Sequence, residues 1–246
     1  NGHRIVVESG AGHWTNFSDK DYSEAGAKIS YNPDDVFACN IILKIEPPSL
    51  DEIKMINPQS VLFSAMQIKT QKKEYFKALA EKRITAIAFD YIQDNHGIYP
   101  LVKSLSEIAG IASILIAAEI MNNNNIGNGL LLGNIGGVPP SKVVIIGAGT
   151  VGEFAARSSI GLGANVKVFD NSITKLRALQ HSLGQLIYTS TIQPKTLQKA
   201  LMRCDVVIGA ARGESRSPVL VTEEMVQQMK EGSFFPSRLN HFPNRQ

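Results

Sequence analysis

The sequence has 246 residues and a net charge of +3, with 43% hydrophobic and 19% charged residues. This balance is typical of a globular protein with a hydrophobic core, and it is too mild to favour binding to nucleic acid or to a membrane surface. Two isolated cysteines, Cys39 and Cys204, form neither a disulfide framework nor a metal motif. We therefore expect a reducing, cytoplasmic location and no metal.

Short strands and helices alternate through the first hundred residues. Ser18 is placed to cap a helix over 19–25. Apolar runs of a few residues are typical of parallel strands that are covered on both faces. The predicted strands are 4–8, 40–44, 61–65 and 85–89, and a helix with one apolar face is predicted over 71–82.

A long apolar helix is predicted over 105–121. Its apolar run, 108–121, is shorter than the roughly 20 residues that a membrane span needs, so we predict a buried helix. A segment rich in Gly, Asn and Pro follows and marks a domain boundary. Strands are then predicted at 142–146, 165–169, 186–189 and 205–209.

These patterns predict an α/β protein with two domains. The predicted parts are a substrate domain over 1–104, a connecting helix and linker over 105–141, a nucleotide-binding domain over 142–233 and an irregular tail over 234–246. Because the first strand has no element before it, we expect the substrate domain to be truncated at its start.

The best-defined motif is GAGTVG, residues 147–152, which follows an apolar strand and opens a helix. Gly147 permits the tight turn, Gly149 lets a diphosphate approach the backbone, and Gly152 lets the helix pack against the sheet. The free N–H groups at the start of the helix, with its dipole, favour phosphate. The motif in this context predicts a dinucleotide-binding turn, and the alternative is a glycine-rich turn that binds nothing.

Asp170 ends the next strand, about 20 residues after the motif. A carboxylate here accepts hydrogen bonds from the ribose hydroxyls and repels a 2′-phosphate, so NAD is favoured over NADP. Asp170 could also cap the helix that begins near Ser172, and the two roles are compatible.

Several segments together resemble the alanine dehydrogenase family and, more distantly, the related domain of proton-translocating transhydrogenase. They include VESGAG, SLSEIAG, GNIGGVPPSKVVIIGAGTVG and CDVVIGA followed by LVTEEMVQQMKEGS, and the resemblance covers residues 1–233. It implies a Rossmann-type NAD-binding domain and a second, truncated, flavodoxin-like α/β substrate domain. It further implies oxidative deamination of L-alanine to pyruvate and ammonia, with hydride transfer to NAD in a cleft between the domains.

The resemblance assigns residues to the cofactor site and implies a homo-oligomer, usually a hexamer in this family. Ser106 of SLSEIAG matches a segment near the cofactor, although it could instead cap a helix. Gly209 and Ala210 are expected to line the nicotinamide side. The full set of expected cofactor contacts is Gly147, Gly149, Thr150, Val151, Gly152, Asp170, Ser106, Gly209 and Ala210.

The substrate side departs from the family pattern at two positions. Glu46 stands where the family has a lysine for the substrate carboxylate, and Lys44 lies two residues earlier, on the same face of a strand. Gln67 stands at the position of the acid/base histidine, and a glutamine cannot exchange a proton near neutral pH. Lys44 could replace the missing lysine or be a solvated charge, and Gln67 could bind substrate or be a loop amide.

The family's substrate-binding arginine and its acidic catalytic residue have no match, so the chain resembles a fragment that lacks both ends. Four interpretations remain open. These are an alanine dehydrogenase with a rearranged carboxylate site, an NAD-binding relative without this activity, a saccharopine-type dehydrogenase selected by Glu46, and a transhydrogenase alpha-type subunit.

Overall fold

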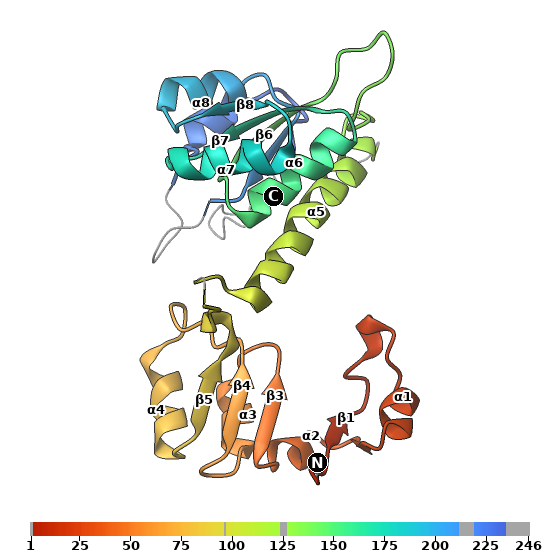
Figure 1. Cartoon of the computed structure of the whole chain (residues 1–246), viewed down its shortest axis with the longest axis vertical. Coiled ribbons are helices and arrows are strands. Elements are labelled where there is room, and N and C mark those ends of the chain that lie inside the picture. The colour runs from red at the N-terminus through yellow and green to blue at the C-terminus, as the bar shows by residue number, and fades with distance from the viewer. Residues whose placement is uncertain (1, 96, 124–126, 212–218, 235–246) are drawn as a thin grey trace. The chain divides into compact units, whose positions relative to one another are not determined.

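The computed structural model describes residues 2–95, 97–123, 127–211 and 219–234. The chain separates into two compact units, residues 1–101 and residues 102–246. Each unit contains strands that pair in parallel with helices between them (Figure 1). The predicted α/β class is confirmed.

The first unit is built on a three-stranded parallel sheet in the order β3-β4-β5. Its strands are β3 (Ile41–Lys44), β4 (Val61–Ser64) and β5 (Thr85–Ala88). Parallel neighbours need a crossover connection, and α3 (Leu50–Met55) and α4 (Lys73–Glu81) supply one each. One core joins the sheet to these helices and contains Phe37, Ile42, Ile53, Ile56, Leu62, Met66, Tyr75 and Leu79. The carboxyl ends of all three strands therefore lie on one edge, which we call the unit 1 carboxyl edge.

A two-stranded parallel sheet precedes this core, made of β1 (Val6–Glu8) and β2 (Lys28–Ser30). Helix α1 (Asp19–Glu24) connects the two strands. The predicted cap is confirmed, because the Ser18 hydroxyl accepts from the N–H of Asp21 and the Asp21 carboxylate accepts from the N–H of Ser18. A short helix, α2 (Pro33–Phe37), follows β2 and begins with proline at its first position.

The second unit contains a four-stranded parallel sheet in the order β8-β7-β6-β9. The strands are β6 (Lys142–Ile146), β7 (Asn165–Phe169), β8 (Tyr188–Ser190) and β9 (Val206–Gly209). This order places the first strand of the unit between the second and the fourth, as in the first half of a doubly wound nucleotide-binding sheet. The expected Rossmann-type domain is confirmed.

Helices cover both faces of this sheet (Figure 1). Val143 and Ile145 of β6 face one core, and Val144 and Ile146 face the other, as the alternation of a strand requires. The first core includes α5 (Pro100–Asn122), α6 (Thr150–Gly161) and α7 (Ile173–Leu183), and the second includes α8 (Pro194–Leu201) and α9 (Glu223–Gln227).

Helix α5 begins at Pro100, five residues before the predicted start. The prediction was based on the apolar run alone, whereas the helix is 23 residues long and by length and composition could cross a membrane. Its residues Ile114, Ala117 and Met121 are buried in the core against the sheet. The prediction of a buried helix is therefore right for one side of α5 only, because Leu105, Ile108 and Leu115 on the same helix are exposed.

The last described residue, Phe234, extends the sheet beyond β9. Its N–H donates to Asp205 (2.9 Å), and its carbonyl accepts from Val207 (2.8 Å), which makes a parallel bridge with Val206. The rest of the expected tail, 235–246, and positions 124–126 of the expected linker lie outside the described residues.

Candidate functional site

The glycine turn lies where the strand order of the second sheet reverses, between β6 and β9. Strand β6 ends at Ile146, and Gly147 adopts a φ of +116°, which favours glycine. A Cβ on Gly147 would lie 2.5 Å from the carbonyl carbon of Ala210, which follows β9. The N–H of Ala210 in turn donates to the carbonyl of Ile146 at 2.8 Å. Gly147 therefore lets the ends of β6 and β9 meet closely at this position.

The other two glycines of the motif have different surroundings. A Cβ on Gly152 would lie 1.9 Å from the carbonyl oxygen of Gly147, so the start of α6 can pack against the turn only if residue 152 is glycine. A Cβ on Gly149 would meet nothing within 4 Å, and its φ of −82° suits any residue. The fold thus requires Gly147 and Gly152, whereas Gly149 borders open space.

Gly149 is also the N-cap of α6, and no side chain caps this helix. Thr150 and Val151 form its first turn. The first N–H groups of a helix lack partners within the helix and carry the positive end of its dipole. Open space and uncapped N–H groups therefore coincide at Gly149, which suits an anionic ligand.

Asp170 lies at the end of β7, beside this turn. Its Oδ2 accepts a hydrogen bond from the N–H of Ala148 at 2.7 Å, and its Oδ1 accepts one from the N–H of Ser172 at 2.7 Å. The helix α7 is capped by the hydroxyl of Ser172, which accepts from Lys175, so Asp170 is not the N-cap. The carboxylate instead fixes the glycine turn to the end of the neighbouring strand.

Ser106 lies within α5, so its alternative assignment as a helix N-cap is wrong. Gly110 of SLSEIAG, which was not predicted as a site residue, lies at the contact between α5 and α6. A Cβ on Gly110 would lie 2.6 Å from the carbonyl oxygen of Val151 and 3.0 Å from the amide nitrogen of Ala155. Gly110 thus lets α5 lie directly against the first turns of α6. An isolated glycine inside an apolar helix was the available signal for such a contact.

Three expected substrate residues belong to the unit 1 carboxyl edge. Lys44 ends β3, Glu46 follows it and is exposed, and Gln67 lies just beyond β4 and is also exposed. The carbonyl of Glu46 accepts from the hydroxyl of Ser64 (2.8 Å), which joins the ends of the two strands. The side chains of Glu46 and Gln67 therefore start from adjacent strand ends, as the parallel pairing requires.

Lys44 has a partner within the first unit. Its Nζ lies 3.1 Å from a carboxylate oxygen of Glu52, at the start of α3, and both side chains are partly buried. Burial of Glu52 opposes its ionisation, but the N–H of Ser49 and the ammonium of Lys44 outweigh it and hold the pKa of Glu52 below the ordinary value. The nearby phenol of Tyr75 has its pKa raised to about 12, first by burial and then by the charge of Glu52. In this arrangement the charge of Lys44 is neutralised by Glu52.

The main chain at Gln67 has an unusual conformation. Its φ is +47°, in the left-handed region that non-glycine residues seldom adopt. Its N–H donates to the carboxylate of Asp90 at 3.0 Å, and that carboxylate also accepts from the N–H of Met66 at 3.1 Å. Asp90, which follows β5, was not foreseen from the sequence. The unit 1 carboxyl edge thus brings Glu46, Gln67 and Asp90 together.

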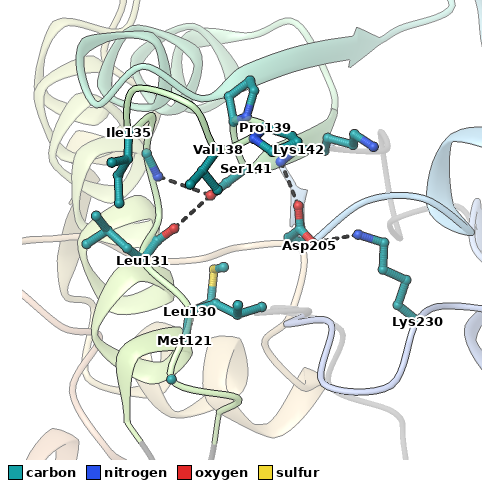
Figure 2. A pocket seen from close by; sticks show the side chains of 13 residues that line it. Met121, Leu130, Leu131, Ile135, Val138, Pro139, Ser141, Lys142, Asp205 and Lys230 are labelled. Carbon is teal, nitrogen blue, oxygen red and sulfur yellow. Dashed lines mark hydrogen bonds and ion pairs between the residues drawn. The ribbon is translucent and has the colours of Figure 1, made fainter.

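Two pockets in the described part of the chain have linings that do not include these residues. One, of about 560 Å³, is next to the unit 1 carboxyl edge and is lined by residues 47–50, 70–72, 74 and 75. The other, of about 410 Å³, lies in the second unit, and Figure 2 shows Leu130, Ile135 and Val138 around it. An ion pair of 2.7 Å between Lys230 and Asp205 lies on its border, at the amino end of the sheet. This second pocket is therefore at the opposite end of the strands from the glycine turn.

Among the described residues, no group of three or more His, Cys, Asp or Glu side chains is arranged to hold a metal ion. The chemistry available at the two sites is thus of two kinds. The glycine turn offers backbone N–H groups and one carboxylate, and the unit 1 carboxyl edge offers an amide and carboxylates.

Family models match almost the whole chain. The model described as "Alanine dehydrogenase/PNT, N-terminal domain" matches residues 1–109, and the one described as "Alanine dehydrogenase/PNT, C-terminal domain" matches residues 113–235. A protein named alanine dehydrogenase from Bacillus subtilis (strain 168) is 36% identical over 234 residues, which cover 95% of this chain and 61% of that protein. The chain thus spans less than two thirds of this relative's length.

Solved structures show the same similarity. One named L-alanine dehydrogenase superposes with a TM-score of 0.86 at 31% identity and covers 95% of this chain and 65% of that one. A transhydrogenase from Sinorhizobium meliloti superposes with a TM-score of 0.80 at 27% identity, over 95% of this chain and 68% of that one. The chain belongs to the alanine dehydrogenase/PNT family.

Proposed function

We propose that the second unit binds NAD at the glycine turn. The observation that carries this proposal is Gly149, whose missing side chain is explained by neither backbone strain nor a neighbouring atom. The N–H groups of Thr150 and Val151 would face the diphosphate. Asp170 would accept from the adenosine ribose hydroxyls with the lone pairs that Ala148 and Ser172 leave free.

Further cofactor contacts follow from position in the same unit. Gly209 ends β9 and Ala210 follows it, beside Gly147 and on the side of the strand reversal where the nicotinamide half is expected. Ser106 lies one helical turn before Gly110, which touches the start of α6, so we keep it as a cofactor-side residue. When bound, NAD supplies a hydride acceptor.

The activity that we propose is the NAD-dependent oxidative deamination of L-alanine to pyruvate and ammonia. It is supported by the names of the relatives, which are alanine dehydrogenases with matching sequence over 94–95% of this chain. We place the amino acid and the 2-oxo acid at the unit 1 carboxyl edge. There the amide of Gln67 would donate to the substrate carbonyl or carboxylate.

Gln67 and Lys44 also determine how the proposed site could exchange a proton and bind the substrate carboxylate. The amide of Gln67 orients substrate but does not exchange a proton, so a water or another side chain must do so. Lys44 would bind a carboxylate only by exchanging its contact with Glu52 for one with the substrate. The proposed site therefore relies on orientation by neutral hydrogen bonds more than on a preformed positive charge.

Glu46 and Gln67 favour a second candidate, an NAD-binding relative without alanine activity. Exposed Glu46 favours a cationic substrate, as in a saccharopine-type dehydrogenase. The likeness to a transhydrogenase supports a subunit that binds NAD and passes hydride to a partner. These alternatives share the cofactor site and differ in what lies at the unit 1 carboxyl edge.

We also propose a homo-oligomer in the cytoplasm. Helix α5 exposes a set of large apolar side chains, and contiguous exposed apolar surface of this kind is typical of subunit contacts. The set is Leu105, Ile108, Ile111, Leu115 and Ile116. Cys39 and Cys204 are free thiols, which fits a reducing compartment. A hexamer, as the family resemblance implies, is the state to test by light scattering.

The proposal is tested on the longest protein that the gene encodes. NADH absorbance is followed at alkaline pH with NAD and L-alanine, beside a panel of other amino acids that includes basic ones, and NAD affinity is measured by calorimetry. Turnover with alanine is expected. NAD binding without turnover of any amino acid would exclude the dehydrogenase and favour the second candidate, and turnover of basic amino acids alone would favour the saccharopine type. The Gly149→Ala variant is the control, because it should fold and lose NAD.

A further inference from the structure

The carboxylate of Asp90 holds two successive backbone groups at the unit 1 carboxyl edge. Asp90 follows β5 in a single 3-10 turn (Phe89–Tyr91). Its Oδ1 accepts from the N–H of Met66 at 3.1 Å, and its Oδ2 accepts from the N–H of Gln67 at 3.0 Å. These are charge-assisted hydrogen bonds to the segment that follows the neighbouring strand, β4.

The opposite side of Gln67 is held as well. Its carbonyl accepts from both the N–H and the hydroxyl of Thr70, each at 2.9 Å. The residue before it, Met66, is buried in the core, where its sulfur lies 3.8 Å from the hydroxyl of Tyr75. The backbone of Gln67 is thus fixed on both sides in a left-handed conformation that it would seldom adopt alone.

The side chain of Gln67, unlike its backbone, is not held by neighbouring groups of the described residues. It is exposed, and among the described residues its amide makes no hydrogen bond. A side chain whose backbone is fixed and whose polar end is unused is suited to contacting a ligand, because little order is lost on binding. The unusual φ decides where this amide points, and Asp90 helps to maintain that φ.

We propose that Asp90 is a positioning residue that aims the amide of Gln67 at the substrate. This inference rests on the proposed function, because it takes Gln67 to contact the amino acid or the 2-oxo acid. Asp90 acts through Gln67 and need not touch the substrate. Two acceptor oxygens are required, since two N–H groups point at one side chain.

The informative variant is Asp90→Asn, which keeps the size of the side chain. An asparagine has one acceptor oxygen, so its NH₂ would face one of the two N–H groups and release that part of the backbone. Asp19→Asn is the matched control. Asp19 also accepts from a backbone N–H, that of Gly10 (2.8 Å), and from the hydroxyl of Ser9 (2.6 Å), but in the β1–β2 region.

The test compares four variants of the longest encoded protein by steady-state kinetics in the direction of reductive amination. We expect Asp90→Asn to lower kcat/KM for pyruvate on the order of ten- to hundredfold, as a small misplacement of a substrate contact does, with the Kd for NAD unchanged. Gln67→Ala should have an effect of similar size. The double variant should be no worse than Gln67→Ala, because both changes remove the same interaction. Asp19→Asn should behave as the wild type.

A second variant and a structural measurement guard against misfolding. Thr70→Val removes one of the two contacts to the Gln67 carbonyl and should give a smaller loss of kcat/KM in the same direction. Hydrogen exchange in the peptide over 62–70 should be faster in Asp90→Asn and unchanged elsewhere in the chain.

The outcomes separate this inference from the proposed function. If the wild type turns over alanine but Asp90→Asn matches it, Asp90 is not a positioning residue and the function stands. Effects of Asp90→Asn and Gln67→Ala that multiply in the double variant would also overturn the inference, since the two residues would then act independently. If the wild type has no turnover, the proposed function fails first and the inference fails with it.

Discussion

The carboxylate of Asp170 accepts a hydrogen bond of 2.7 Å from the backbone N–H of Ala148, and this contact joins the end of β7 to the middle of the glycine turn. The same carboxylate accepts from Ser172 with its other oxygen. Asp170 therefore has a structural role before any cofactor binds, and its role toward the ribose is added to it. A change at this position is expected to affect both the turn and the choice of cofactor.

We expect Asp170→Asn to weaken NAD binding and to reduce the preference for NAD over NADP. Asparagine keeps one acceptor, so one backbone N–H loses its partner, and the negative charge that repels a 2′-phosphate is gone. A loss of about 1.5–3 kcal/mol in NAD binding is the scale for a hydrogen bond to a charged group. Calorimetric titration with NAD and with NADP measures both effects. An unchanged ratio of the two affinities would show that Asp170 does not select the cofactor.

Two glycines of the motif, Gly149 and Gly152, should respond differently to alanine. Gly149→Ala should leave the unfolding temperature unchanged, because the new methyl group meets nothing, yet abolish detectable NAD binding. Gly152→Ala should destabilise the fold by about 1–3 kcal/mol or more, since the methyl group would collide with the carbonyl of Gly147. Thermal unfolding and calorimetry on each variant separate these effects. Normal NAD affinity in Gly149→Ala would place the ligand elsewhere.

Gly110→Ala tests the contact between α5 and α6. The added methyl group would lie 2.6 Å from a backbone oxygen, so the two helices must move apart, at a cost of about 1–3 kcal/mol. Because α6 carries the cofactor turn, NAD affinity should fall as well. Gly161→Ala is the control. Gly161 is the last residue of α6, and its added methyl group would meet nothing within 4 Å. Equal unfolding temperatures for the two variants would contradict a tight contact at Gly110.

Tyr75 should make stability depend on pH above 10. Its pKa is raised from 10.0 to about 12 in the folded protein, so the unfolded chain loses this proton first as the pH rises. The contribution to stability is complete below pH 10 and is lost between pH 10 and 12. Urea unfolding of the wild type and Tyr75→Phe across this range measures it. The urea concentration at half unfolding should fall more steeply with pH in the wild type than in Tyr75→Phe. Parallel pH dependences of the two proteins would show that the pKa of Tyr75 is not raised.

Much of the second unit could be predicted from local sequence. The strands β6 and β7 lie where the apolar runs predicted them, because buried parallel strands are marked by such runs. Strand β2 and helix α2 were not predicted, since three and five residues are too few to show a period. The start of α5 was placed late because its first turn, before Leu105, carries no continuous apolar run.

The contacts that shape the two sites were harder to foresee. Asp90 reaches residues 66 and 67 across more than twenty positions of the chain, and only the pairing of β4 with β5 brings them together. Gly110 meets α6 some forty residues later for a similar reason. By contrast, the cap at Ser18 acts within four residues and was predicted correctly. Local chemistry can be found in the sequence, while contacts set by register need the structure.

The three glycines of the motif have different structural roles, and this difference predicts how each position would change during evolution. A descendant of this protein that no longer needed a dinucleotide would be free to change residue 149, whereas residues 147 and 152 would still be kept by the packing of the turn. A surviving pattern of glycines is thus a record of two different selective pressures. In a relative whose activity is in doubt, the identity of the residue at position 149 is therefore the more informative of the three.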